Sequence, residues 1–279
     1  MLSQSPARLA AWILLSPALL FVAVFFLLPV IALLLESFHV GQTYGLQNYL
    51  TFFADDFNRE VYWRTLWISL LVTLVSALVC YPAAYAVLKI NPRWRGLIIG
   101  LIILPLMTSP VARTYTWLVV LGREGIVNKS LVETGLLQEP LRILFTEWAV
   151  FIGLLQLMMP LMLLSLVSAM ENLPKDVVPA ARSLGASEGQ VFWRVILPLT
   201  REGLVVGGTL VFTGCVTAYV TPALLGGPRV TMLATLLYQK AGVTVDYAAA
   251  AVISAVMLLT TLLVNFLLRG RAVKTARAA

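Results

Sequence analysis

Two runs of polar and aromatic residues interrupt apolar stretches of the chain, and they are the residues best suited to handling a solute. The first run contains Thr108, Ser109, Arg113, Tyr115 and Trp117, and the second contains Tyr219 and Thr221. Hydroxyl and guanidinium groups are costly in lipid, so inside apolar segments they indicate a substrate pathway or a gate. For Arg113, Tyr115 and Trp117 the alternative is anchoring at the membrane interface, and Arg113 could also pair with an acidic residue.

The residue types that catalysis needs are nearly absent. His39 is the single histidine, which is too few for a zinc hydrolase or a Ser-His triad. No Gly-x-x-x-x-Gly-Lys-Ser/Thr loop occurs that could hold nucleotide phosphates. The two cysteines, Cys80 and Cys215, lie inside apolar segments, where a small buried side chain is their ordinary role. We therefore predict no catalytic residue, no metal site and no cofactor in this chain, which disfavours an integral membrane enzyme.

The segments that must position these residues are apolar enough to cross a bilayer. Of the 279 residues, 60% are hydrophobic and 12% are charged, whereas soluble domains average about 25% charged residues. We predict an all-α integral membrane protein with one transmembrane domain over residues 1–279. Its six predicted transmembrane helices cover about 11–35, 63–88, 97–121, 147–170, 203–225 and 248–268. Prolines 105, 110 and 222 predict breaks in the third and fifth helices.

The distribution of Lys and Arg predicts the orientation of these helices. Twelve lie in the N-terminus, the 89–96 and 171–202 links and the C-terminal tail, against seven in the alternate loops. The excess side is expected to be cytoplasmic, so both termini and the 171–202 link are placed there. Short interfacial helices are expected in the opposite loops, at Leu46–Phe53 and Leu131–Leu137. The net charge of +7 is not gathered into one region, so no nucleic-acid partner is expected.

The polar segment 171–202, between the fourth and fifth predicted helices, combines balanced charge with a helical apolar rhythm. Its apolar face is formed by Val177, Val178, Ala181 and Leu184. We expect Pro174 and Asp176 in the first turn of this helix, and Gly185 at a sharp turn after it. A second helix should start near Ala186 and be broken at Pro198, which redirects the chain. Such a structured polar element in a membrane protein predicts contact with another protein.

The spacing in this segment resembles a known signature. Ala180-Ala181, three residues, Gly185, nine residues and then Val195-x-Leu197-Pro198 are similar to the Glu-Ala-Ala motif of permeases in binding-protein-dependent ABC importers. Pro179 and Val195 stand where that family usually has Glu and Ile. The resemblance implies a cytoplasmic coupling helix that contacts an ATPase. The candidate coupling residues are then Pro174, Lys175, Asp176, Ala180, Ala181, Arg182, Leu184, Gly185 and Pro198.

Three further stretches resemble the polyamine-type (spermidine/putrescine) permeases. They are Tyr81–Tyr85, Leu104–Gly122 and Tyr219–Pro228. The cargo implied is a polyamine or a similar small organic amine, with an opine, an aminophosphonate, a sugar or iron as alternatives. A stand-alone channel or secondary carrier is a further alternative, which predicts transport by the purified chain alone.

The resemblance also implies an assembly in the bacterial inner membrane. Two permeases would form the pathway, the second being a paralogue or an identical copy. Two ATPase subunits would carry the ATP and Mg, and a periplasmic or lipid-anchored binding protein would deliver the solute. We expect Gly203-x-x-x-Gly207-Gly208 to pack closely against the partner permease, with packing inside the chain as the alternative.

Overall fold

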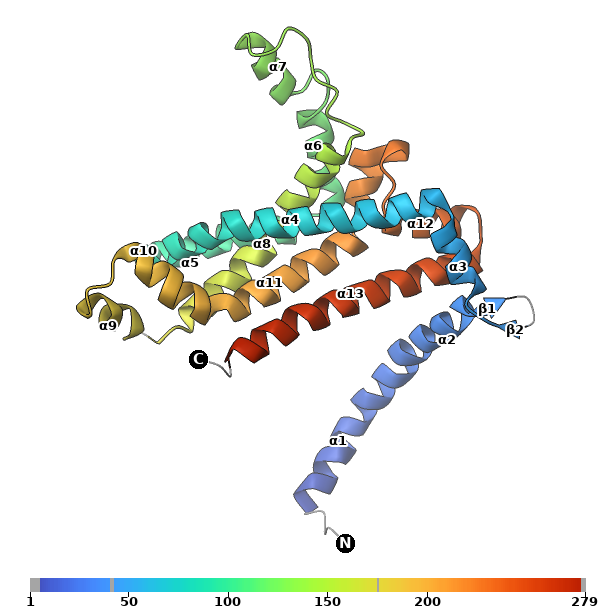
Figure 1. Cartoon of the computed structure of the whole chain (residues 1–279), viewed down its shortest axis with the longest axis horizontal. Helices are drawn as coiled ribbons and strands as arrows, with labels where there is room; N and C mark the ends of the chain where they lie inside the picture. The colour runs from blue at the N-terminus through green and yellow to red at the C-terminus, as the bar shows by residue number, and fades with distance from the viewer. Residues whose placement is uncertain (1–5, 41–42, 175, 277–279) are drawn as a thin grey trace. The chain divides into compact units, whose positions relative to one another are not determined.

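The computed structural model describes residues 6–40, 43–174 and 176–276, and these are almost entirely helical (Figure 1). Among them, five helices are long and apolar enough to cross a membrane, or up to six if the bent pair Arg93–Met107 and Pro110–Val120 is one span. The prediction of a mostly helical membrane protein is therefore confirmed. One small hairpin departs from it, formed by β1 (His39–Val40) and β2 (Thr43–Tyr44).

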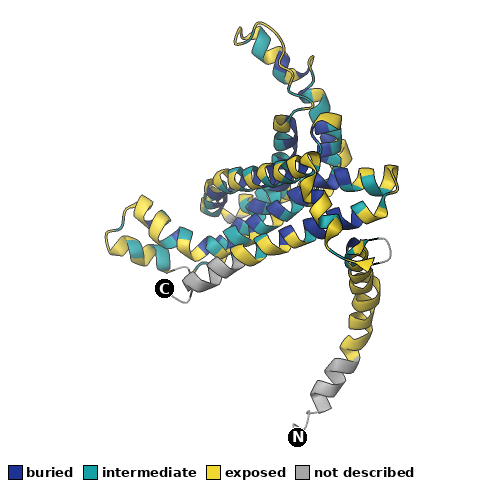
Figure 2. Ribbon diagram, turned by 45° about the vertical axis from the view of Figure 1, so that its right-hand side comes forward, coloured by how far each residue is buried: buried dark blue, intermediate teal, exposed yellow. Residues whose placement is uncertain are grey.

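The chain divides into two compact units, and the first comprises the described residues up to Arg59 together with Leu237–Val256. Its first helix runs through α1 (Pro6–Val22), the π turn η1 (Ala23–Leu27) and α2 (Leu28–Ser37). Most of the large apolar side chains from Leu14 to Leu35 are exposed, as suits a lipid-facing helix (Figure 2). The hydroxyl of Ser37 lies 2.6 Å from that of Tyr49, which joins α2 to α3 (Gln47–Ala54).

The second unit comprises Glu60–Leu236 and the described residues from Met257, and the helices α4, α12 and α13 contribute residues to both units. Its elements, with those shared helices given in full, are α4 (Asp56–Lys89), α5 (Pro92–Ile103), η2 (Leu104–Met107), α6 (Pro110–Val120), α7 (Ile126–Glu133), α8 (Glu147–Glu171), α9 (Val177–Ser183), α10 (Glu188–Val191), η3 (Phe192–Ile196), α11 (Leu197–Thr217), η4 (Pro222–Gly226), η5 (Gly227–Arg229), α12 (Leu233–Tyr238) and α13 (Tyr247–Ala276). The π turn η6 (Gln239–Val243) belongs to the first unit.

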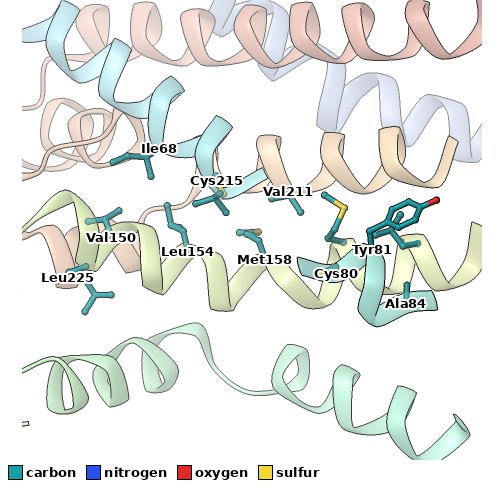
Figure 3. Packing of buried hydrophobic residues seen from close by; sticks show 14 of the residues in the cluster. Ile68, Cys80, Tyr81, Ala84, Val150, Leu154, Met158, Val211, Cys215 and Leu225 are labelled. Atoms are coloured by element: carbon teal, nitrogen blue, oxygen red, sulfur yellow. The ribbon is translucent and has the colours of Figure 1, made fainter. Parts of the chain in front are cut away.

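The core of the second unit is the contact between α8 and α11. Leu154 and Met158 of α8 face Val211 and Cys215 of α11, and all four side chains are buried (Figure 3). The glycines of α11 allow this close approach, because a Cβ atom added at Gly203 would lie 2.2 Å from the Cβ atom of Ala169 on α8.

Gly203, Gly207 and Gly208 on α11 were predicted to pack against the partner permease, and this prediction is wrong. A Cβ atom at Gly207 would meet the sulfur of Met162 at 2.7 Å, and one at Gly208 would meet Thr73 of α4 at 3.6 Å. All three glycines thus face helices of their own chain, and the alternative reading, packing inside the chain, holds.

Ion pairs fix the relative positions of helix ends in this unit. At the start of α4, Arg64 donates to Glu147 at the start of α8 at 2.8 Å, and it also pairs with Glu60. At the other end, Arg95 of α5 pairs with Glu171, the last residue of α8. The helices α4 and α8 therefore run in the same direction, and α5 starts where α8 ends.

Proline effects explain where the predicted helix bounds differ from the structure. The helical segment Glu188–Thr217 is continuous through Pro198, so the predicted break there is wrong. The N–H of Leu197 bonds to the carbonyl of Phe192 across the π turn η3, and this wider turn accommodates the missing N–H of the proline. The first helix passes Pro29 in the same way after η1.

The predicted bounds of the fifth helix, 203–225, are wrong at both ends. Its helical segment begins earlier and stops at Thr217, where Ala218 adopts an extended conformation, and residues 222–226 form the separate π turn η4. The predicted interruption before Pro222 is confirmed. The predicted short helices exist as α3 and α7, but α7 starts five residues earlier than Leu131.

Candidate functional site

Two places in the second unit hold the residues singled out by sequence: the polar segment 171–202 at one end of the helical body, and the broken helix α5–α6 with the neighbouring turn η4. In Figure 1, α9 and α10 form the projecting hairpin of the polar segment. The helix α9 connects to α8 through residues 172–176 and to α10 through residues 184–187. The helix α9 also contacts α10 and η3 directly, so its motion can reach the rest of the polar segment through these links and through these contacts.

The helix α9 starts three residues later than Pro174. Asp176 occupies its N-cap, without a side-chain bond to the backbone, and the carbonyl of Pro174 accepts a bond from the N–H of Val177 at 3.3 Å. The prediction that Pro174 lies in the first helical turn is thus wrong. Pro179 is the third residue of α9, where a backbone N–H would lack a partner within the helix, so a proline fits there. Lys175 lies outside the described residues.

The end of α9 is fixed by Gly185, as the sequence predicts. Gly185 has φ +83, a conformation that favours glycine. Its N–H donates to the carbonyl of Arg182 at 2.9 Å, and the N–H of Ala186 donates to the carbonyl of Ala181 at 3.1 Å. These two bonds form a Schellman motif, which satisfies carbonyls that the helix end would otherwise leave unpaired.

The predicted apolar face of α9 is divided in the structure. Val177, Val178 and Ala181 are half-buried, and Ala180 is exposed. Leu184 is 90% exposed, so it does not pack with the rest of its face inside this chain. A leucine that exposed is available for a partner.

Of the two cationic candidate coupling residues, Arg182 is the one that the structure describes, and it is already paired. Arg182 lies 2.7 Å from Glu188, at the start of α10, and both side chains are about half exposed. An ion pair this exposed contributes little stability, but it connects α9 to the start of α10. Ser187 and Gln190 add a capping box at the start of α10.

The break in the third predicted helix is a sharp bend of 92° between the helix ending at Met107 and the helix starting at Pro110. Thr108 is extended and its hydroxyl donates to the carbonyl of Pro105 at 2.7 Å, while Ser109 is the N-cap of α6 without a side-chain bond. Both side chains are exposed. Proline at the first position of α6 and in η2 explains why the helix stops and restarts here.

Arg113 is held on α6 by a backbone bond to Ser109 at 3.1 Å. Its Nε and Nη1 atoms are buried and find no hydrogen-bond partner among the described residues. The expected alternative of an acidic partner is therefore not found in the part of the chain that the structure describes. A guanidinium in this state is available to a group that is not part of the described chain.

The aromatic candidate residues of the pathway differ in how far their side chains are exposed. Tyr115 is exposed, whereas Trp117 is half-buried and lines a pocket of about 320 Å³ with Pro105 and with Gln156 of α8. Tyr219 follows the end of α11, and its carbonyl accepts a bond from Ala223 at 3.0 Å.

Two hydroxyl groups bring the two predicted runs together. Thr114 of α6 and Thr221, just before η4, are both buried, and their Oγ1 atoms lie 3.2 Å apart. Thr114 already donates its single proton to the carbonyl of Pro110 at 2.8 Å, so Thr221 must be the donor in the pair. Thr114 was not predicted from sequence, where nothing distinguishes it from Thr116.

We expect the hydroxyl pair to act as a unit. Replacing Thr221 by valine keeps the shape but removes the donor, and should destabilise the contact between α6 and η4 by about 1 kcal/mol. Thr114→Val should have a similar effect, and the double variant should be no worse than the more affected single variant. Thermal unfolding of the three variants measures this, with Thr116→Val on the exposed face of α6 as the matched control. Strictly additive effects would show that the two hydroxyls do not interact.

Comparison with known proteins identifies the family. Residues 18–271 match the family described as binding-protein-dependent transport system inner membrane component. The chain belongs to this family. It is therefore a permease, a transport subunit rather than an enzyme, in agreement with the resemblance of the polar segment. A multi-pass inner-membrane location follows from the same match and from the apolar helices.

Relatives of this permease include two curated proteins named spermidine/putrescine transport system permease protein PotB. The protein from Haemophilus influenzae is 39% identical over 195 residues, which cover 70% of this chain and 68% of that protein. The protein from Escherichia coli strain K12 is 33% identical, covering 72% of this chain and 73% of that protein.

A solved structure shows the same fold. A bacterial ABC transporter involved in the import of the acidic polysaccharide alginate contains a chain that matches this permease with a TM-score of 0.81 and 17% identity, covering 96% of both chains. At this identity the likeness concerns the fold alone.

Proposed function

We propose that residues 1–279 act as one transmembrane domain with six spans, the third one bent, and form half of the pathway of an ATP-driven importer. A second permease would complete the pathway, and two ATPase subunits would supply the energy from the cytoplasmic side. The excess of Lys and Arg supports a cytoplasmic location for both termini and the polar segment. A binding protein would deliver the solute to the opposite face.

The observation that supports the coupling role is the exposed side chain of Leu184 at the end of α9. A helix fixed by a Schellman motif at Gly185 and by the Arg182–Glu188 pair presents a 90% exposed leucine. Burying a leucine in a partner's groove contributes about 1.5–3 kcal/mol. We assign Leu184 as the anchor to the ATPase, with Ala180 and Asp176 beside it. Arg182 keeps α9 and α10 together instead of reaching the partner, which revises its expected role.

The candidate pathway residues would form the outer gate. The contact between Thr114 and Thr221 joins the bent third span to η4, which follows the fifth. Changing that contact would open or close the pathway between the two permeases. Thr108, Ser109, Tyr115, Trp117 and Tyr219 surround this contact in sequence, and Arg113 would be part of the gate.

The cargo proposed is a polyamine or a similar small organic amine. Support comes from the two relatives named for spermidine and putrescine transport. Arg113 would repel a polyammonium chain, so we assign it to the gate and not to a binding site for this cargo. An anionic or neutral cargo would instead allow direct contact with Arg113.

Uptake by the reconstituted complex tests this function. Proteoliposomes holding this permease, its second permease and its ATPase should import labelled spermidine when ATP and the loaded binding protein are present, whereas the chain alone should import none. Leu184→Asp should lower uptake tenfold or more, since it places a charge in an apolar contact, and Leu184→Met should stay near wild type. Transport by the chain alone would contradict the proposal. A binding protein that holds only a sugar would overturn the cargo and leave the importer role intact.

A further inference from the structure

An aromatic cluster joins the polar segment to the end of α4. The ring of Phe192, the first residue of η3, makes edge-to-face contacts with Tyr81 at 5.3 Å and with Tyr85 at 6.1 Å between ring centroids. Both tyrosines belong to α4. Aromatic pairs in this geometry contribute stability beyond the apolar area that they bury.

A buried hydrogen bond reinforces the same junction. The hydroxyl of Tyr81 lies 2.5 Å from that of Thr200 on α11, and both side chains are buried. Thr200 donates its proton to the carbonyl of Ile196 at 2.8 Å, so Tyr81 is the donor in the pair. Lys89, at the end of α4, lies 4.2 Å above the ring of Tyr85. Three side chains of α4 therefore take part in this junction.

The path from α9 to Phe192 contains no flexible linker. Only residues 184–187 separate α9 from α10, and their backbone is held by the Schellman motif and the capping box. The helix α10 then continues without interruption into η3 and α11. A displacement of α9 is therefore carried to Phe192, and through it to α4.

We propose that Phe192 and Tyr81 are positioning residues that transmit the motion of α9 to α4, so that α4 and α11 move together when the ATPase closes. This inference rests on the proposed coupling role of α9. The π turn η3 serves it by aiming Phe192 at α4 while the helix passes Pro198. Without the aromatic contact, α9 and α11 would move while α4 stayed behind, and ATP would be hydrolysed without transport.

The experiment measures how many solute molecules are imported per ATP hydrolysed by the reconstituted complex. Phe192→Leu removes the ring edges but keeps an apolar side chain, and should lower this ratio fivefold or more, with ATPase binding close to wild type and a small loss of thermal stability from the two lost ring contacts. Tyr81→Phe removes one oxygen atom and should lower the ratio by a smaller factor. The double variant should be no worse than Phe192→Leu, because both act through one junction.

Matched variants separate transmission from general packing. Trp193→Leu removes an aromatic ring from the same π turn, but that ring is exposed and its ring contact is with Phe192. The number of solute molecules imported per ATP by this variant should therefore stay at the wild-type value. Phe192→Tyr keeps the ring and should retain most of the coupling. Should Phe192→Leu fail to accumulate, Tyr81→Phe carries the test alone.

An unchanged ratio in Phe192→Leu, or in Tyr81→Phe where the first variant does not accumulate, would overturn the proposal. Different results would contradict the proposed function. They are a wild-type permease that does not bind the ATPase, or a Leu184→Asp variant that transports normally. The two failures are therefore distinguishable.

Discussion

Replacing Gly185 by valine is expected to uncouple ATP hydrolysis from transport, with at least a tenfold loss of uptake. Gly185 has φ +83, and no heavy atom lies within 4 Å of the position that a Cβ atom would take. The cost is therefore conformational rather than steric contact with a neighbour. An L-residue in this conformation costs about 1–2 kcal/mol, and a β-branched one more. The chain would relieve this cost by unwinding the end of α9, which would displace Leu184 from its proposed docking position.

Two variants control for this interpretation. Gly189 in α10 also has open space around its Cβ position but no positive φ, so Gly189→Ala should keep wild-type uptake. Gly185→Asn should be milder than Gly185→Val, because asparagine tolerates the left-handed conformation. ATPase activity and uptake are measured together in proteoliposomes. Wild-type coupling in Gly185→Val would mean that the exact end of α9 is unimportant.

The second large effect is expected at Gly203, where alanine should destabilise the permease by about 1–3 kcal/mol. The added Cβ atom would lie 2.2 Å from the Cβ atom of Ala169 and 3.0 Å from the carbonyl oxygen of Ser165. The hydroxyl of Ser165 also donates to the carbonyl of Gly203 at 3.0 Å, so separating the helices breaks this bond as well. The loss should appear in thermal unfolding in detergent and in the amount of folded protein.

A matched control and a rescue are available on the same helices. At Gly208 the added Cβ atom would lie 3.6 Å from Thr73, an ordinary contact, so Gly208→Ala should be neutral or slightly stabilising. Ala169→Gly combined with Gly203→Ala should recover part of the loss, because it removes the nearest atom. Equal unfolding temperatures for Gly203→Ala and the wild type would refute the close approach of α8 and α11.

Local chemistry explains which features could be predicted from sequence. The apolar segments and the bend at Pro105 and Pro110 follow from composition and from the missing N–H of proline. Gly185 was predictable as a helix end because few other residues adopt its conformation. The coupling role of the polar segment was predicted from the spacing of its residues and its cytoplasmic side from the count of Lys and Arg, and both stay predictions.

The features that were predicted wrongly depend on the surroundings of a residue. Pro198 breaks a helix only where no π turn accommodates it, and that turn depends on packing that the sequence does not display. Gly203 could face any neighbour, and only the three-dimensional contact with Ala169 selects α8. The pairing of Thr114 with Thr221 joins residues 107 positions apart, and no local pattern marks it.

The unbroken helical segment Glu188–Thr217 has a consequence for the scale of the movement. Its 30 residues span about 45 Å at 1.5 Å per residue, from the polar segment to the break beside η4. A tilt of about 5° at one end of a rod of this length displaces the other end by about 4 Å, more than the separation of the Thr114 and Thr221 hydroxyls. A small angular change at the polar segment would therefore suffice to break the contact between Thr114 and Thr221 beyond the other end of this helical segment.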